Sequence, residues 1–394
     1  MYIVYTSLIK LIEVQMLLSY SAKNFYCFKE GIEVPLRLGK SCPESVANNK
    51  GVTDVLCVKG ANGAGKSNAL KILNFLSNFC CDSFSLKPEA IFDYKTFFDN
   101  DNPTDFRVEF EVEGTEYYYD LKITKKEILK ETITRKNERK TILFERNKNK
   151  IVKNISEFED LKKIKLRSNA SIISTAHQYE VEQLNFVYSF FYKIVPSIDA
   201  ALNLLSAKSF ETINQVYYEN ENYLIFVKEI LKKCDLGIKD FSIKKIEIDD
   251  SENKYKPSFI HENNGKDYEL PLEQESNGTR NLYKQLFAYK LALETGGVFV
   301  LDEFDISLHP DILPLLVDLF TNEETNPKNA QFLFTTHTSA ILNKLGKYRT
   351  ILVNKEENES YLYRLDELPG DLIRNDRPLE PIYRSGRIGG VPRV

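Results

Sequence analysis

The order of apolar and polar residues divides the chain into strand-like and helix-like segments. Short alternating runs, among them LLSYSAKNFYCF (17–28) and VTDVLCV (52–58), predict strands within the first sixty residues. Residues 106–124 alternate on both sides of the sequence EGTE and predict a β-hairpin. ETITRKN (131–137) and KTILFERN (140–147) extend this hairpin, so the first part of the chain is expected to carry an antiparallel β-lobe.

Helical spacing of apolar residues appears later in the chain. Residues 181–235 show this spacing, but the segment is too short and too aromatic for sustained heptads. It predicts a compact helical insertion, followed by a hairpin in residues 241–270. A second amphipathic helix is predicted by apolar residues that recur three and four positions apart: Leu282, Leu286, Tyr289 and Leu293.

Two runs without polar residues predict strands that are buried on both faces. They are Val298–Leu301 and Phe332–Phe334. Strands of this kind occur in parallel sheets that helices cover on both sides. The chain is therefore predicted to have an α/β fold.

A glycine-rich turn joins the strand at 52–58 to a helix that begins near Ser67. Residues 60–67 read GANGAGKS and fit the P-loop pattern. Glycines let successive backbone N–H groups turn inward, and the helix N-terminus adds its positive end, so the turn predicts a phosphate cradle. Lys66 is expected on the outer phosphates and Ser67 on magnesium. The expected nucleotide contacts are Gly60, Asn62, Gly63, Ala64, Gly65, Lys66, Ser67 and Asn68.

Two carboxylates follow the first of the apolar runs. Asp302 and Glu303 are expected at the C-terminal edge of the sheet, where open α/β sheets bind ligands. Asp302 would hold magnesium through water, and Glu303 would polarise the attacking water. His337 follows the second run, and its place at a strand end predicts contact with the γ-phosphate. Thr338 or Ser339 is expected to cap the next helix.

A second helix start with a glycine lies upstream of these carboxylates. Ser276, Asn277 and Gly278 come just before the helix that contains Leu282, and Ser276 or Thr279 is expected to cap it. Such a turn predicts a second anion site, which one chain cannot easily bring to the nucleotide at its own P-loop. We therefore expect two chains to associate head to tail, with ATP between the P-loop of one and the Ser-Asn-Gly turn of the other.

The order and spacing of these motifs resemble the ABC-type ATPases. SNGTRNL (276–282) stands where their signature stands, with Asn277 in place of a glycine and Thr279 in place of Gln or Glu. DEFDISLHP (302–310) resembles the Walker B motif and D-loop of the soluble SMC/RecF-like members. The chain is most similar to the short "AAA family ATPase" group of bacterial abortive infection and anti-phage defence.

The tail, PIYRSGRIGGVPRV (381–394), is typical of that group. The resemblance covers about residues 16–80, 165–180 and 265–394, and it implies an ABC-type P-loop ATPase head with a mixed β-lobe and a RecA-like core sheet. The expected domains are an N-terminal part of the head (16–180), a helical insertion (181–240) and a C-terminal part of the head (241–394).

The resemblance also implies an activity and its requirements. The expected enzyme is an ATPase that uses ATP and Mg²⁺ and forms a homodimer or a higher homo-oligomer. It would control a separately encoded effector, a nuclease or toxin, without a membrane. Gln178, which ends the apolar stretch SNASIISTAHQ (168–178), would be the glutamine that follows a strand in ABC-type heads and contacts magnesium and the attacking water.

Charge points to a candidate binding surface in only one part of the chain. The formal net charge of −4 gives the chain no general attraction to nucleic acid or to an acidic membrane. Residues 121–167 nevertheless hold sixteen Lys/Arg against seven Asp/Glu. This excess fits either a surface for nucleic acid or an acidic partner, or solvated hairpins with extended lysines.

The location of the protein is inferred from further features of composition. The six cysteines lack CxxC spacing, which favours free thiols in a reducing compartment over zinc sites or disulfides. The chain start lacks a signal-peptide pattern and no window reaches the length of a membrane span, so a cytoplasmic location is expected. Met16 opens a clear strand pattern, and residues 1–15 are interpreted as an upstream extension of no structural importance.

Three other functions are compatible with a P-loop. A RecF-like DNA-binding repair or recombination ATPase is favoured by the basic stretch and opposed by the acidic total. A transporter ATPase subunit is opposed by the divergent signature and by the D-loop DEFDISLHP. A small-molecule kinase needs no signature turn.

Overall fold

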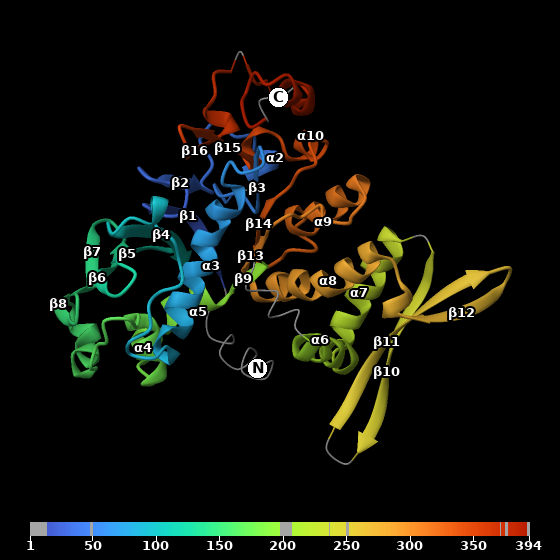
Figure 1. The fold of residues 1–394 in the computed structure, drawn as a ribbon, viewed down its shortest axis with the longest axis horizontal. Coiled ribbons are helices and arrows are strands. Elements are labelled where there is room, and N and C mark those ends of the chain that lie inside the picture. Colours follow the sequence, from blue (N-terminus) through green and yellow to red (C-terminus); the bar gives the residue numbers. More distant parts are fainter. Residues whose placement is uncertain are drawn as a thin grey trace.

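The computed structural model describes residues 14–391 except 48–49, 198–206, 236, 250–251, 371 and 375–376. Three sheets and the helices between them form the molecule (Figure 1). Most of the expected upstream extension, residues 1–13, lies outside the described residues. Gln15 is already part of the first strand and its side chain is buried, so the extension ends earlier than expected.

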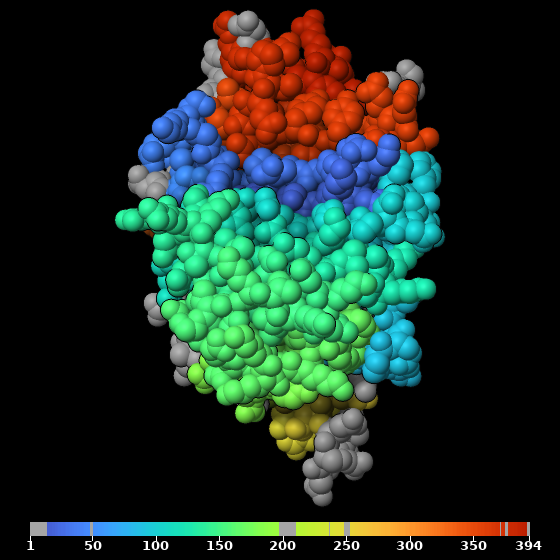
Figure 2. All heavy atoms as spheres, turned by 90° about the vertical axis from the view of Figure 1, so that its left-hand side faces the viewer, coloured from blue at the N-terminus to red at the C-terminus, as the bar shows by residue number. Residues whose placement is uncertain are grey.

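The first lobe is an antiparallel sheet of seven strands, in the order β2–β1–β4–β5–β6–β7–β8. The strands are β1 (Gln15–Lys23), β2 (Ile32–Pro35), β4 (Thr104–Val112), β5 (Thr115–Ile123), β6 (Ile128–Lys136), β7 (Lys140–Asn147) and β8 (Lys150–Asn154). The predicted hairpin is β4–β5, and its predicted extension is β6–β7. Figure 2 looks onto this lobe, which is coloured cyan to green.

The core sheet has six strands in the order β16–β15–β3–β14–β13–β9. They are β3 (Val55–Gly60), β9 (Ile194–Ser197), β13 (Val298–Leu301), β14 (Gln331–Thr335), β15 (Thr350–Glu356) and β16 (Glu359–Arg364). All neighbours are parallel except β15 and β16. The two apolar runs are the fully buried strands β13 and β14, as predicted. Their C-terminal ends therefore lie at the same edge as the end of β3.

Helices cover both faces of this sheet (Figure 1). Because side chains alternate along a strand, Leu56 and Val58 face one side and Val55 and Cys57 face the other. The first side carries α3 (Lys66–Asp82), α4 (Ile172–Gln178) and α5 (Asn185–Tyr192). The second side carries α8 (Asn277–Thr295) and α9 (Leu313–Thr321). The predicted apolar face of α8 is buried on this second side.

The predicted helical insertion is interrupted by a core strand. Between residues 181 and 240, α5 packs on α3, and β9 pairs with β13 at the sheet edge. Only α6 (Ala207–Glu219) and α7 (Glu221–Cys234) match the prediction. They pack on each other, on α8 and on a third sheet of β10 (Ile238–Asp249), β11 (Glu252–Asn263) and β12 (Lys266–Pro271). The hairpin β10–β11 projects away from the core (Figure 1).

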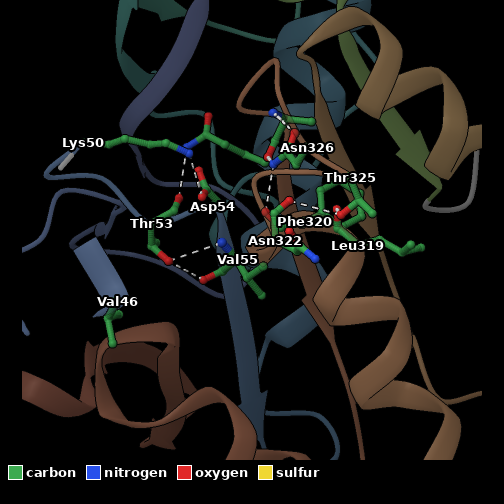
Figure 3. Close-up of polar contacts among 12 residues, drawn as sticks. Val46, Lys50, Thr53, Asp54, Val55, Leu319, Phe320, Asn322, Thr325 and Asn326 are labelled. Atoms are coloured by element: carbon green, nitrogen blue, oxygen red, sulfur yellow. Dashed lines mark hydrogen bonds and ion pairs between the residues drawn. The ribbon is translucent and has the colours of Figure 1, made fainter. Parts of the chain in front are cut away.

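Polar contacts hold the loops at the N-terminal ends of the core strands (Figure 3). Lys50 pairs with Asp54 at 3.1 Å, and the Thr53 hydroxyl donates to the Val55 carbonyl at 2.7 Å. The Asn326 amide donates to the carbonyls of Phe320 and Ala330 at 2.8 Å. These contacts fix the sheet edge that lies opposite to the glycine-rich turn.

The remaining helices are α2 (Glu44–Ala47), α10 (Ile341–Leu345) and α11 (Leu379–Arg384). The C-terminal residues pack against β15 and α10 in a separate apolar cluster that includes Leu352, Tyr383 and Ile388. All six cysteines are free, as predicted. Among the described residues, no helix is both long enough and apolar enough to cross a membrane.

Candidate functional site

The glycine-rich turn 60–67 lies between the end of β3 and the start of α3. Gly63 and Gly65 adopt positive φ angles of 73° and 111°, which side chains other than glycine rarely adopt. Gly65 is the N-cap of α3, and no side chain caps this helix. The first backbone N–H groups of α3 are therefore left for a ligand, as the P-loop prediction requires.

Lys66 lies over the turn and faces the carboxylates of the core sheet. Its ammonium group donates to the carbonyls of Gly60 and Ala61, both at 3.1 Å. Burial lowers the pKa of Lys66, while the nearby charges of Asp302, Glu303 and Asp305 act to raise it. The cation of the P-loop and the acids at the end of β13 thus share one electrostatic environment.

The neighbouring strand β14 holds both acids after β13 in place. The Thr335 hydroxyl donates to the Asp302 carboxylate at 2.5 Å and accepts from the Glu303 amide at 2.8 Å. Asp302 is thereby oriented at the sheet edge where Ser67 lies in the first turn of α3. A hydroxyl and a carboxylate are oxygen ligands of the kind that Mg²⁺ prefers together with water.

Glu303 and His337 face each other at this edge. The distance from His337 Nε2 to Glu303 Oε1 is 4.0 Å, and their side chains are 49% and 53% exposed. Glu303 has a φ of +54°, a conformation that non-glycine residues hold only when surrounding contacts impose it. Both side chains are open to a ligand, which fits the predicted roles on water and on a terminal phosphate.

Asp305 holds the loop that carries His337, a role that the motif alone does not predict. Its carboxylate accepts from the amides of His337 and Thr338 at 3.1 and 2.8 Å, and from the Thr338 hydroxyl at 2.7 Å. Burial acts to raise the pKa of Asp305, but the bonds from Thr338 and His337 outweigh it and lower the pKa. Asp305 therefore stays charged and anchors the loop.

The predicted cap of the helix after His337 is wrong. α10 begins at Ile341 after Ala340, and no side chain caps it. The Thr338 hydroxyl is bonded to Asp305, and the Ser339 hydroxyl donates to Glu380 at 3.0 Å. Tertiary contacts therefore recruit both hydroxyls that local capping would have used.

The turn before α8 is capped as predicted. Ser276 is the N-cap, and its hydroxyl oxygen accepts from the Thr279 amide at 3.1 Å. Asn277 opens the helix, and its side chain accepts from Arg280. Gly278 also has a packing role within the chain, because a Cβ there would lie 2.6 Å from the Ser307 carbonyl oxygen of the D-loop.

The two helix starts lie on opposite faces of the core sheet. α3 packs with the cluster that contains Leu56 and Val58, whereas α8 packs with the cluster that contains Val55 and Cys57. Figure 1 shows the sheet between them. The structure therefore does not bring the Ser276 turn to the P-loop of the same chain.

Gln178 does not lie where the ABC-type glutamine was expected. The segment before it is the helix α4 rather than a strand, and the Gln178 side chain is exposed. The Ser174 hydroxyl in α4 donates to the Cys81 carbonyl at the C-terminal end of α3. Because α3 has 17 residues and rises about 1.5 Å per residue, that end is roughly 24 Å from Lys66. Gln178 therefore cannot contact a metal at Ser67 in this conformation.

A hollow of about 440 Å³, which the sequence pattern did not predict, lies beside the P-loop. The loop after β1 and the β15–β16 hairpin meet there. The Asn68 amide donates to Cys27 Sγ at 3.2 Å, and the Lys355 ammonium donates to the Gly63 carbonyl at 3.5 Å. The hollow is lined by Tyr26, Cys27, Asn68, Phe98, Lys355 and Asn358, among others. In NFYCF (24–28), the aromatic residue that lines the hollow is Tyr26, and it is the signal that the sequence offered there.

A polar network connects the third sheet to the turn before α8. His261 on β11 lies 2.7 Å from the Glu275 carboxylate, and the Thr279 hydroxyl donates to Asp235 at 2.8 Å. The bond to Glu275 raises the pKa of His261. Ser276 therefore lies between Glu275, which is bonded to β11, and Thr279, which is bonded to Asp235 after α7.

Half of the cationic side chains in the basic stretch 121–167 form ion pairs within its own lobe. Eight of its sixteen cationic side chains form ion pairs. Five of these are exposed, Lys122 and Lys125 are half-buried, and Arg146 pairs with Glu131 in the interior. This pairing favours the interpretation of solvated hairpins over that of a nucleic-acid surface.

One family model and a number of solved structures match this chain. The family model described as "AAA domain, putative AbiEii toxin, Type IV TA system" matches residues 55–343 of the 394-residue chain. No curated protein matches the chain.

Two solved structures are similar to this chain. The SMC head domain from Thermotoga maritima is 15% identical, with a TM-score of 0.45, and the match covers 88% of this chain and 98% of that one. The second is the Smc head domain with an extended coiled coil bound to the C-terminal domain of ScpA, from Pyrococcus furiosus. It is 12% identical, with a TM-score of 0.47, covering 90% of this chain and 98% of that one.

Proposed function

The chain belongs to the AAA domain family of the AbiEii toxin type, and on this premise we propose that it is an ATP-driven switch. In this proposal two chains close head to tail on ATP, hydrolysis separates them, and the change controls a separately encoded effector in anti-phage defence. The observation that supports it best is the placement of two helix starts, the uncapped one at Gly65 and the one capped by Ser276, on opposite faces of one sheet.

The residues at the edge of the core sheet that carries the P-loop would each bind a different part of the nucleotide. The backbone N–H groups at the start of α3 and the Lys66 ammonium would bind the phosphates. Ser67 and Asp302 would hold Mg²⁺, which supplies charge neutralisation on the phosphate oxygens when bound. The base and ribose would occupy the hollow beside Asn68, where aromatic rings and amide groups meet.

Glu303 and His337 would act at the terminal phosphate. Glu303 is half exposed and 4.0 Å from His337, so a water molecule between them and the phosphate can be oriented by Glu303. His337 would contact the γ-phosphate and thereby report whether it is still present.

Closure would follow from the second helix start. The Ser276 hydroxyl and the N-terminus of α8 would bind the γ-phosphate held by the other chain. Each charge-assisted hydrogen bond contributes about 1.5–3 kcal/mol, and a symmetric dimer would make several at each of two nucleotides. That is enough to make association depend on ATP.

The family description names a putative toxin of a toxin–antitoxin system. This supports the defence role in the proposal, whereas the separate effector rests on the switch mechanism alone. The alternative of direct DNA binding is less well supported, since half of the cationic side chains in residues 121–167 are ion-paired within the lobe.

The variant Glu303→Gln tests the switch. It keeps the shape of the side chain but removes the base, so hydrolysis should fall at least about 100-fold while ATP still binds. Size-exclusion chromatography with light scattering should show a stable dimer with ATP and Mg²⁺ and a monomer without them. Lys66→Ala, which loses phosphate contacts, should stay monomeric. A Glu303→Gln protein that binds ATP and remains monomeric would falsify the proposal.

A further inference from the structure

Lys59 is a buried cation that the proposed reaction does not use. It is the residue before Gly60 in β3, and only 2% of its surface is exposed. Burial lowers its pKa, although Cys57, Asp305 and Glu380 nearby act to raise it. An apolar residue would suit this strand better, because burying an ammonium group is costly unless it is well bonded. The bonds that Lys59 makes therefore indicate its role.

Both hydrogen bonds from the Lys59 ammonium group go to backbone carbonyls of the loop that carries His337. Its ammonium group donates to the His337 carbonyl at 2.9 Å and to the Thr336 carbonyl at 3.5 Å. The amides of the same loop point the other way, to the Asp305 carboxylate. The loop is thus held between the Lys59 ammonium group, from the strand that leads into the P-loop, and the Asp305 carboxylate, from the D-loop.

The C-terminal tail also contacts Lys59 and the loop that follows His337. The ring of Tyr383 on α11 lies 5.0 Å from the Lys59 ammonium, within range of a cation–π interaction. The Tyr383 hydroxyl donates to the Gly390 carbonyl, and the Gly390 amide donates to Asn354 on β15, both at 2.7 Å. Glu380, also on α11, accepts from the Ser339 hydroxyl. The tail therefore connects the strand beside the P-loop with the loop after His337.

We propose that Lys59 is a positioning residue, which together with α11 fixes the His337 loop relative to the P-loop. Lys59 does not touch the nucleotide in this proposal. It connects β3, which leads into the P-loop, with the loop that places His337 against Glu303. The inference rests on the proposed function for its catalytic consequence, whereas the contact itself can be tested without hydrolysis.

Lys59→Met is the test variant, since methionine fills similar space without charge or donors. Two independent readouts separate positioning from a merely structural role. The first compares the steady-state rate of ATP hydrolysis with the ATP affinity, which is measured by calorimetry. The second is hydrogen exchange, followed by mass spectrometry, of peptides that contain residues 336–343. Lys148→Met, the same change at a side chain that is 63% exposed on the β-lobe, is the matched control.

The proposal predicts a particular combination of results. Lys59→Met should lower kcat at least tenfold, change ATP affinity less than threefold, and speed exchange in residues 336–343. Its melting temperature should fall by no more than a few degrees, because the substitution removes two hydrogen bonds to carbonyls and also the cost of burying an ammonium group. Lys148→Met should match the wild type in every measurement.

Three outcomes would overturn it. They are wild-type kcat and exchange rates in a folded Lys59→Met protein, a loss of ATP affinity that accounts for the loss of kcat, or faster exchange throughout the chain. If Lys59→Met does not fold, Tyr383→Leu carries the test, and it should speed exchange in the same peptides; unchanged exchange there would also overturn the proposal. A wild-type protein that does not hydrolyse ATP would contradict the proposed function alone, because the exchange comparison needs no turnover.

Discussion

Thr335 determines how the two acids after β13 are presented. It bonds the Asp302 carboxylate through its hydroxyl and accepts the Glu303 amide, so one side chain fixes both residues. The positive φ of Glu303 is a conformation that such a contact helps to impose. The chemistry of the site therefore depends on a residue from the neighbouring strand.

Thr335→Val should damage catalysis more than stability. Valine keeps the shape but leaves the Glu303 amide without its acceptor and frees the Asp302 side chain. Hydrogen bonds to charged groups are worth about 1.5–3 kcal/mol, so we expect kcat to fall roughly 10- to 100-fold. Steady-state ATPase assays and thermal melting measure both effects.

Gln178→Ala is the matched control for Thr335→Val, because Gln178 is exposed and far from Lys66 along α3. We expect its ATPase rate to stay within about twofold of the wild type, as for a surface substitution. A strong loss of activity in Gln178→Ala, or an unchanged rate in Thr335→Val, would contradict this account of the site.

Single residues show what a linear motif can and cannot predict. Lys66, Asp302 and Glu303 were predicted correctly as neighbours, because a strand and a glycine turn fix where their side chains emerge. Gln178 was misplaced because SIISTAHQ (171–178) has apolar residues that fit a strand or a helix. Asp305 and Lys59 were missed because they bond backbone atoms of His337, which lies 32 positions from Asp305 and 278 positions from Lys59.

At the scale of elements, the turn before α8 depends on a sheet that lies outside the core. His261 on β11 bonds Glu275, the residue before the cap Ser276, and Asp235 after α7 bonds Thr279. Movement of β11 would therefore reach the turn through the contact of His261 with Glu275, and movement at the end of α7 would reach it through the contact of Asp235 with Thr279.

The His261–Glu275 contact predicts a pH dependence of stability. The folded pKa of His261 is raised above its ordinary 6.5, first by the bond to Glu275 and further by its contact with Gly237 and the charge of Asp235. A raised folded pKa means that protonation favours folding. The contribution is therefore fully present below pH 6.5 and is lost as the pH rises through the folded pKa.

Urea unfolding of the wild type and of His261→Asn between pH 5.5 and 9 measures this contribution. The advantage of the wild type should be largest at the acidic end and should shrink towards pH 9. An advantage that is constant across the range, or that grows with pH, would show that the imidazolium–carboxylate contact does not stabilise the fold.

Elements with regular patterns were predicted more reliably than short ones. The hairpins of the β-lobe and the apolar face of α8 were predicted because several residues carry the same period. β9 was missed because four residues, IVPS (194–197), follow a helix directly and carry no period of their own. Its assignment to the core comes only from pairing with β13.

For the whole molecule, the predicted α/β architecture is confirmed, with an antiparallel lobe beside a mostly parallel core sheet. The sequence could not show that the sheet separates α3 from α8, because that depends on which face each helix covers. This separation is the basis of the head-to-tail proposal, since neither chain alone can bring Ser276 to its own P-loop.

The most direct test of the head-to-tail site mixes two inactive variants. Lys66→Ala removes the phosphate contacts of the P-loop. Ser276→Asp keeps a good helix cap but places a negative charge against the phosphate. Ser276→Asn, an equally good cap without the charge, is the control and should remain more active than Ser276→Asp.

In a mixed dimer, the intact P-loop of the Ser276→Asp chain meets the intact turn of the Lys66→Ala chain. Because neither variant should form a stable dimer with itself, the dimers that form are mixed, and each has one working site of two. The ATPase rate of the mixture should therefore rise well above that of either variant alone, to at most about half of the wild-type rate. A mixture that stays at the average of the two inactive proteins would contradict the shared site.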